Sequence, residues 1–188
     1  MPEGFVDLPL GWKWATVGDM SREVRYGYTF RATREPVGPR FLRITDIKEG
    51  EVDWSTVPYC RIDERDEDKY RIDDGDLLFA RSGSVGKSFL ARNPPRAVFA
   101  SYLIRVRAVP EVLPAYLYWF FQTSYYWKQI PLQGITQPNV NAKVLRAISL
   151  PFVPLNLQSR IVSRIAAFHS RFRTARSSCV RGLRHLHD

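Results

Sequence analysis

Apolar and polar positions along the chain predict a set of short β-strands. Residues 41–44 and 102–107 alternate apolar and polar side chains as half-buried strands do, and the arginines of 102–107 fall on one face. Residues 77–80 and 89–91 are short apolar runs on either side of a Gly/Ser-rich loop. The pattern predicts a sheet that is mainly antiparallel or mixed.

Helical patterns lie between and after these strands. A short helix is expected after the opening segment 8–14, with Thr16 as its N-cap. Residues 113–130 have helical periodicity, with Pro114 tolerated in the first turn. Aromatic side chains at helical spacing favour a core role over base stacking. The aromatic side chains in this segment are Tyr116, Trp119, Phe120, Tyr126 and Trp127.

The C-terminal segment has a different pattern, and Pro151 and Pro154 separate it from the rest. Its apolar positions are spaced 4, 4, 3, 4, 3, 4 and 4 residues apart, close to a heptad repeat. A long amphipathic helix of this kind either folds back on its own domain or pairs with another helix. The apolar positions are Leu157, Ile161, Ile165, Phe168, Phe172, Ala175, Cys179 and Leu183. We therefore predict an α+β domain at residues 1–154 and a coiled-coil-type helix at 155–188.

The charge is distributed unevenly along the chain. The formal net charge is +9, and it divides into +2 for residues 1–48, −7 for 49–76 and +14 for 77–188. A positive field of this kind favours a polyanionic partner, and nucleic acid is the first candidate. A protein whose basic helix has no such partner is the alternative that charge alone leaves open.

Composition excludes several other classes of protein. The hydrophobic content of 45% is that of a folded chain, and the start of the chain lacks a signal-peptide pattern, so a cytoplasmic protein is expected. Cys60 and Cys179 are expected to be free thiols. The three histidines, all in the last 20 residues, lack the spacing of a helical metal site, so no metal site is expected.

Three loops carry the residue types that DNA recognition requires. In the loop at 81–88, Arg81, Ser82, Ser84 and Lys87 can bond to phosphates, and the glycines let the backbone approach. The alternative interpretation of this loop is a plain glycine hairpin.

A second stretch combines aromatic and basic side chains, at Tyr26, Tyr28, Arg31 and Arg34, and Arg43 is added from the strand at 41–44. For each residue here, a place on the solvated surface is an equally good interpretation.

The third loop is rich in amides. Gln137, Asn139 and Asn141 could pair with adenine edges, with Lys143 beside them. Either asparagine could instead cap the short helix that carries Lys143 and Arg146.

Two enzyme hypotheses fail on the residues. Gly86-Lys87-Ser88 resembles the end of a phosphate-binding loop, but the glycine required five residues earlier is Arg81. Asn93-Pro94-Pro95 resembles the catalytic motif of amino-methyltransferases, but Arg96 stands where an aromatic residue would stack on the extruded base. The chain is therefore not expected to be an enzyme.

The order of the motifs resembles the specificity subunits of type I restriction-modification systems. The segments that carry the resemblance are 8–12 (LPLGW), 43–47 (RITDI), 75–78 (GDLL), 81–87 (RSGSVGK), 101–103 (SYL), 137–141 (QPNVN) and 150–155 (LPFVPL). Each segment is weak alone, but their shared order over nearly the whole chain is specific. The chain departs from the family at Leu157-Gln158, where the family usually has Glu-Gln.

The resemblance implies a target-recognition domain that reads one half of a bipartite DNA site. It also implies partner methylation and restriction subunits, with S-adenosylmethionine on the methylation subunit and no cofactor on this chain. Since family members carry two such units, this chain is expected to be half of a subunit, either natural or cut from a longer one. A homodimer with antiparallel helices would restore two readers. The alternative hypothesis is a coiled-coil interaction protein with non-specific DNA affinity.

Overall fold

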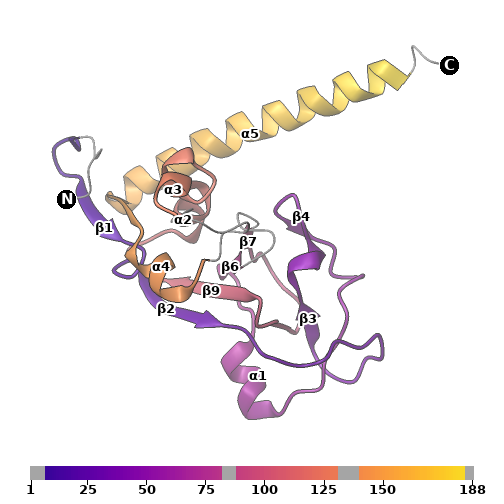
Figure 1. The fold of residues 1–188 in the computed structure, drawn as a ribbon. Helices are drawn as coiled ribbons and strands as arrows, with labels where there is room; N and C mark the ends of the chain where they lie inside the picture. Colours follow the sequence, from indigo (N-terminus) through magenta and orange to yellow (C-terminus); the bar gives the residue numbers. More distant parts are fainter. Residues whose placement is uncertain (1–6, 82–87, 131–139, 185–188) are drawn as a thin grey trace.

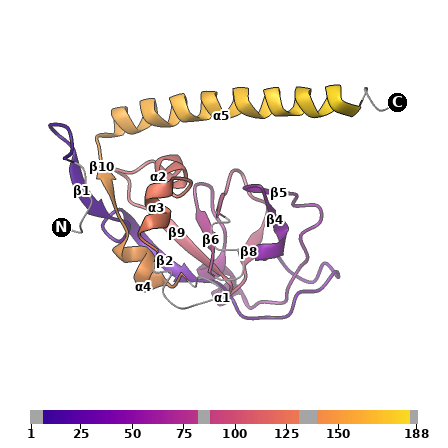
Figure 2. The ribbon, with the colours of Figure 1, turned by 45° about the horizontal axis from the view of Figure 1, so that its top comes forward.

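The computed structural model describes residues 7–81, 88–130 and 140–184, with the side chains of the last helix described as far as Arg171. A globular α+β part is followed by one long helix, α5 (Leu155–Arg184), which begins beside two short helices and runs on past them (Figures 1 and 2). The predicted fold class and the long C-terminal helix are confirmed.

The central sheet has four antiparallel strands in the order β2-β9-β6-β7. They are β2 (Ser21–Tyr26), β9 (Leu103–Ala108), β6 (Leu77–Ala80) and β7 (Ser88–Leu90). All four residues of β6 are buried, as expected for the apolar run at 77–80. The loop at 81–88 therefore joins two antiparallel strands, whereas a phosphate-binding loop opens a helix.

Three two-stranded pairs complete the strands. β1 (Lys13–Thr16) pairs antiparallel with β10 (Ser149–Phe152), and β4 (Ile47–Lys48) pairs antiparallel with β5 (Glu51–Val52). β3 (Arg40–Leu42) pairs parallel with β8 (Ala97–Phe99), so the prediction of mixed pairing is confirmed.

Four short α-helices and one 3-10 turn cover the strands. The 3-10 helix η1 spans Ile44–Asp46, and the α-helices are α1 (Glu64–Tyr70), α2 (Pro114–Phe120), α3 (Ser124–Lys128) and α4 (Ala142–Ala147). Pro114 is the first residue of α2, as predicted, because its missing N–H has no partner at that position anyway. Of the aromatic series, Tyr116 and Tyr126 are buried, and Trp119, Phe120 and Trp127 are half-buried.

Two local predictions were wrong. No helix follows Thr16, which ends β1; its side chain and Asp19 exchange hydrogen bonds that close a single turn. The helix expected over 113–130 is divided in two, because Thr123 accepts a hydrogen bond from Tyr126 N and caps α3 as a new helix.

A network of charged side chains lies on one face of the central sheet. Arg105 in β9 is fully buried, with its guanidinium group over the ring of Phe99, and it bonds to Glu23 and to the carbonyls of Lys69 and Arg71. On the same face, Arg107 bonds to Asp73 and places Nε 2.8 Å from Oδ1 of the buried Asp76. Both β9 arginines are therefore satisfied within the protein.

Among the described residues, no helix combines the length and the apolar character that crossing a membrane requires. The first turns of α5 contact the globular part instead, where Leu157, Ile161 and Val162 pack against the larger core cluster. The connection between β2 and β3 lies on the side of the domain away from α5 in both views (Figures 1 and 2).

Candidate nucleic-acid interface

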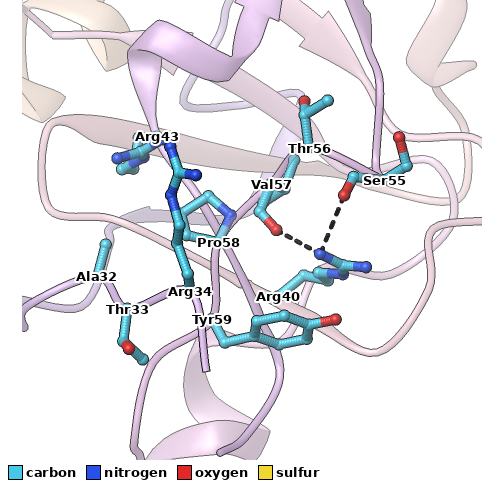
Figure 3. A pocket seen from close by; sticks show the side chains of 10 residues that line it. All are labelled: Ala32, Thr33, Arg34, Arg40, Arg43, Ser55, Thr56, Val57, Pro58 and Tyr59. Atoms are coloured by element: carbon cyan, nitrogen blue, oxygen red, sulfur yellow. Dashed lines mark hydrogen bonds between the residues drawn. The ribbon is translucent and has the colours of Figure 1, made fainter. Parts of the chain in front are cut away.

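The connection between β2 and β3 and the residues after β5 enclose a pocket of about 680 Å³ that is rich in arginine. We call this the arginine pocket; its lining is Ala32, Thr33, Arg34, Arg40, Arg43, Ser55, Thr56, Val57, Pro58 and Tyr59. Arg34 and Arg43 lie at one end, and Arg40 lies over the Tyr59 ring at the other (Figure 3). Three guanidinium groups in one hollow make a site suited to phosphate oxygens.

Two of these arginines are fixed by other parts of the protein. Arg43 forms two side-chain hydrogen bonds to Asp46, at 3.0 and 2.8 Å, and these bonds raise the pKa of Arg43. Arg40 Nη1 donates to the carbonyl of Val57 at 2.6 Å, and its guanidinium carbon is 4.2 Å from the Tyr59 ring centroid. Arg34 is exposed, so it can turn toward a bound anion without breaking hydrogen bonds such as those of Arg40 and Arg43.

A second pocket of about 390 Å³ shares Ala32 and Arg43 with the arginine pocket. Exposed aromatic rings lie on its rim, since Tyr102 is 63% exposed and Phe30 50%. Tyr28 stacks on Phe30, with 5.6 Å between the ring centroids. Large exposed rings beside arginines supply apolar contact surface, as a surface that contacts bases requires.

A third group of residues joins β2, the end of β6 and α4. The Arg81 guanidinium carbon is 5.1 Å from the Tyr26 ring centroid, and Tyr26 Oη accepts from Ala142 N at 2.9 Å. Arg81 N donates to Tyr102 O, and Arg81 O accepts from Val140 N, so this group adjoins the second pocket. The three groups together form the candidate nucleic-acid interface.

The sequence left two roles open for Asn141, a helix cap and a contact with a base. In the structure Asn141 is the helix cap. Its Oδ1 accepts from Val144 N at 2.9 Å, so the amide oxygen is occupied at the start of α4. Lys143 is exposed on the same helix, while the Arg146 guanidinium donates to Val24 O at 3.2 Å. Lys143 is therefore the α4 side chain best placed to meet a phosphate.

The structure brings together five of the predicted contact residues, Tyr26, Tyr28, Arg34, Arg43 and Arg81, while Asn141 caps α4 beside them. Arg31 is exposed on the connection between β2 and β3 and lines neither pocket. Ser82, Ser84, Lys87, Gln137 and Asn139 lie outside the described residues. Within the part of the chain described, no cluster of side chains could hold a metal ion.

The sequence analysis did not select four residues of the interface: Phe30, Arg40, Tyr59 and Tyr102. Phe30 stands inside the basic-aromatic stretch that was selected, so its type and position were a usable signal. Tyr102 lies in an alternating strand pattern that gives no sign of its exposure. Arg40 and Tyr59 meet across the turn after β5, and only the folded chain reveals that contact.

We call the apolar positions predicted along the C-terminal helix, from Leu157 to Leu183, the seam. Those that the structure describes lie in two environments. Leu157 and Ile161 pack on the domain to which they belong, and Ile165 lines an apolar groove of about 400 Å³ between α5 and α2. Phe168 is 73% exposed, although its ring is a large apolar group. Phe172 and Ala175 lie on α5, and their side chains fall outside the description.

Comparison with known proteins decides the family. The model of the type I restriction modification DNA specificity domain matches residues 9–177. The chain belongs to this family. The resemblance inferred from the motif order is thereby confirmed.

Two curated relatives in this family are specificity subunits. One is the MjaX type I restriction enzyme specificity subunit of Methanocaldococcus jannaschii, 24% identical over 171 residues, which cover 86% of this chain and 40% of the relative. The other is the EcoKI specificity subunit of Escherichia coli, 27% identical over 152 residues, with 76% and 33% covered. The chain thus spans well under half the length of either relative.

Solved structures show the same fold. A chain from a study of complex assembly and conformational transition in the type I R-M system superimposes with a TM-score of 0.74 at 19% identity, covering 93% of this chain and 42% of that one. The HsdS subunit from Thermoanaerobacter tengcongensis gives a TM-score of 0.71 at 19% identity, covering 92% and 41%.

Proposed function

We propose that this chain is a non-catalytic DNA-recognition unit that reads one half of a bipartite site. The observation that carries the proposal is the continuous surface of arginines and exposed aromatic rings, from Arg34 through Tyr102 to Arg81, in a chain of the specificity-domain family. Phosphate contacts hold a protein on DNA without selecting a sequence, and base contacts select it. The surface offers both kinds of contact.

We assign different roles to the two kinds of side chain. Arg31, Arg34, Arg81 and Lys143 contact phosphates. Tyr102 and Phe30 make apolar contacts with base edges in the major groove, where a thymine methyl is the apolar feature. Arg40 and Arg43 contact a phosphate in the arginine pocket as well, and their bonds within the protein hold their guanidinium groups in place there.

A homodimer through α5 provides the second DNA-recognition domain. The spacing of the apolar positions reads the same from either end of the seam. Two antiparallel copies would therefore place Phe168 opposite the second copy's Phe172, and Ile165 opposite its Ala175. A two-fold axis at this place buries the exposed Phe168 ring and gives the central apolar positions, from Ile165 to Ala175, an apolar neighbour.

Methylation and restriction subunits complete the proposed complex. This chain contributes no cofactor, and the methylation subunit brings S-adenosylmethionine and transfers its methyl group to adenine. The chain directs that chemistry by fixing where the complex binds. We expect the complex to act in the cytoplasm.

The direct test is to map methylated adenines after co-expression with the cognate methylation subunit. A single bipartite sequence motif that carries the methyl groups supports the proposal. The absence of any sequence motif, with the methylation subunit shown to be active beside another specificity subunit, contradicts it. Non-specific DNA affinity without sequence choice would then favour the coiled-coil interaction protein.

The assigned roles are tested by DNA binding at several salt concentrations. Arg34→Ala should weaken binding to all sequences alike and reduce the slope of log affinity against log salt by about 0.9, as one phosphate contact does. Tyr102→Ala should leave that slope unchanged and reduce the preference for the cognate site. Arg92→Ala, an exposed arginine outside both pockets, is the matched control.

A further inference from the structure

The joint between α5 and the domain contains a buried amide. Gln158, in the first turn of α5, is fully buried. Its Oε1 accepts from Leu113 N at 2.7 Å, and its Nε2 donates to Glu111 O at 3.0 Å and to Val153 O at 2.8 Å. One side chain thus bonds to the residue before α2, to the turn preceding it and to the residue that follows β10.

Packing alone does not require an amide at this position. Burying an amide is costly unless it is hydrogen-bonded, and an apolar side chain of similar volume would fill the same space. Three bonds to backbone atoms in two separate segments supply something that apolar contact lacks, because hydrogen bonds are directional. They fix the side chain, and with it the first turn of α5, in one orientation.

The remaining contacts of α5 leave more freedom. Ile161 and Ile165 make apolar contacts toward α2, and the His169 ring meets the edge of Trp119 with 5.2 Å between centroids. Apolar side chains can slide past one another at small cost, whereas a bonded amide cannot move without breaking its bonds. Gln158 therefore limits the tilt of α5 more strongly than these contacts do.

We propose that Gln158 is the positioning residue that sets the angle at which α5 leaves the domain, and thereby the distance between the two DNA half-sites. This inference rests on the proposed function, in which α5 joins two readers. α5 has 30 residues, a length of about 45 Å at ~1.5 Å per residue. A tilt of about 5° moves its far end by roughly 4 Å, more than the ~3.4 Å rise of one base pair.

The orientation can be measured without DNA. Spin labels at Arg61 and Arg171, both exposed, report the distance between the domain and α5. Cys179→Ser removes one competing thiol, and burial raises the pKa of the other, Cys60, to about 11, so that thiol does not react. The measurement uses the full chain, diluted with unlabelled protein so that only distances within one copy contribute.

Two variants remove the bonds in different ways. Gln158→Met keeps the volume and loses all three bonds, and Gln158→Glu keeps the acceptor for Leu113 N and loses both donations. Each should broaden the distance distribution, while Ser159→Ala, which loses only a bond within α5, should not. A folded Gln158→Met variant with the native narrow distribution overturns the proposal. Rapid hydrogen exchange of the Gln158 side-chain NH2 group in the unaltered protein would also overturn it, because the bonds to Glu111 O and Val153 O would then not be persistent.

The consequence for DNA is tested on sites whose half-sites are moved apart by one base pair at a time. The Gln158→Met variant should bind a single half-site as the unaltered protein does, and its preference for the native spacing should fall about tenfold, or about 1.4 kcal/mol. An equal loss at every spacing would show a folding role and overturn the proposal. Failure of the unaltered protein to choose any half-site would instead contradict the proposed function, and the spin-label result would still stand.

Discussion

The two arginines of β9 show that basic residues in this chain do not all serve a polyanion. Arg105 is fully buried, and Glu23, Asp76 and two backbone carbonyls surround its guanidinium group. Arg107 bonds to Asp73 and Asp76. Part of the +14 charge of residues 77–188 is therefore neutralised within the domain, and the positive charge available to a polyanion is smaller than the sequence suggests.

Removing the charge of Arg105 should strongly destabilise the domain. Arg105→Met leaves Glu23 without its buried partner, whereas Asp76 keeps its bonds to Arg107, and breaking a buried pair costs about 3–5 kcal/mol. Arg25→Ala removes the other partner of Glu23, an arginine whose side chain is 36% exposed, and should cost about 0–1 kcal/mol. Urea unfolding of the two variants measures the difference, and equal midpoints would contradict the assigned role of Arg105.

The same network predicts a loss of stability in acid. Burial acts to raise the pKa of Glu23, but the hydrogen bonds and charges of Arg105 and Arg25 together outweigh it, and the net pKa is lowered. A lowered pKa in the folded state gives stability that is present above the unfolded value of about 4.3 and is lost as the pH falls through the folded value. Thermal unfolding between pH 7 and pH 3 should show this loss. The Glu23→Gln variant should show a smaller dependence on pH over the same range.

At the scale of single elements, local chemistry predicted some features well. The apolar runs became β6 and β7, Pro114 begins α2, and Asn141 caps α4. Each of these features depends on residues close together in the sequence. Their patterns were therefore visible without the fold.

Other elements depend on partners far away in the chain. Trp14 pairs with Pro151 in the β1–β10 ladder, and Phe41 pairs in parallel with Val98. The strand at 13–16 resembled the approach to a helix because its partner strand is more than 130 residues later. The candidate interface was predicted in part for the same reason: the selected loops meet, but the contact of Arg40 with Tyr59 and the exposure of Tyr102 arise only on folding.

The Asn141 cap gives a prediction at this scale. Asn141→Ala removes the acceptor for Val144 N, so the variant should lose about 1 kcal/mol of stability and fray α4. Since α4 also holds Tyr26 through Ala142 N, DNA affinity should fall as well. Asn141→Asp keeps the cap and should retain the stability. Thermal unfolding and DNA titration of both variants separate the cap from a direct contact of the amide with a base.

At the scale of the whole molecule, the two faces have different tasks. The connection between β2 and β3, which carries Arg31 and Arg34, lies away from α5 (Figure 2). A helix on the opposite side can join two copies without covering the candidate nucleic-acid interface. The Phe168 side chain is 73% exposed in a single copy, and the apolar positions of α5 are therefore where the dimer can be tested.

The dimer prediction specifies both the residues and their register. Phe168→Glu should give a folded monomer, because it places two carboxylates near the proposed axis, whereas the exposed Ala167→Glu should remain dimeric. Sedimentation equilibrium measures both.

Register is tested in a Cys179→Ser background, where Ile165→Cys and Ala175→Cys should cross-link only to each other when the two variants are mixed. A disulfide requires Cα atoms within about 7 Å, and antiparallel pairing separates each position from its own copy by about ten residues, or ~15 Å. Cross-linking of Ile165→Cys to itself would indicate parallel helices and contradict the antiparallel dimer. A Phe168→Glu protein that stays dimeric would exclude the apolar positions of α5 as the dimer interface.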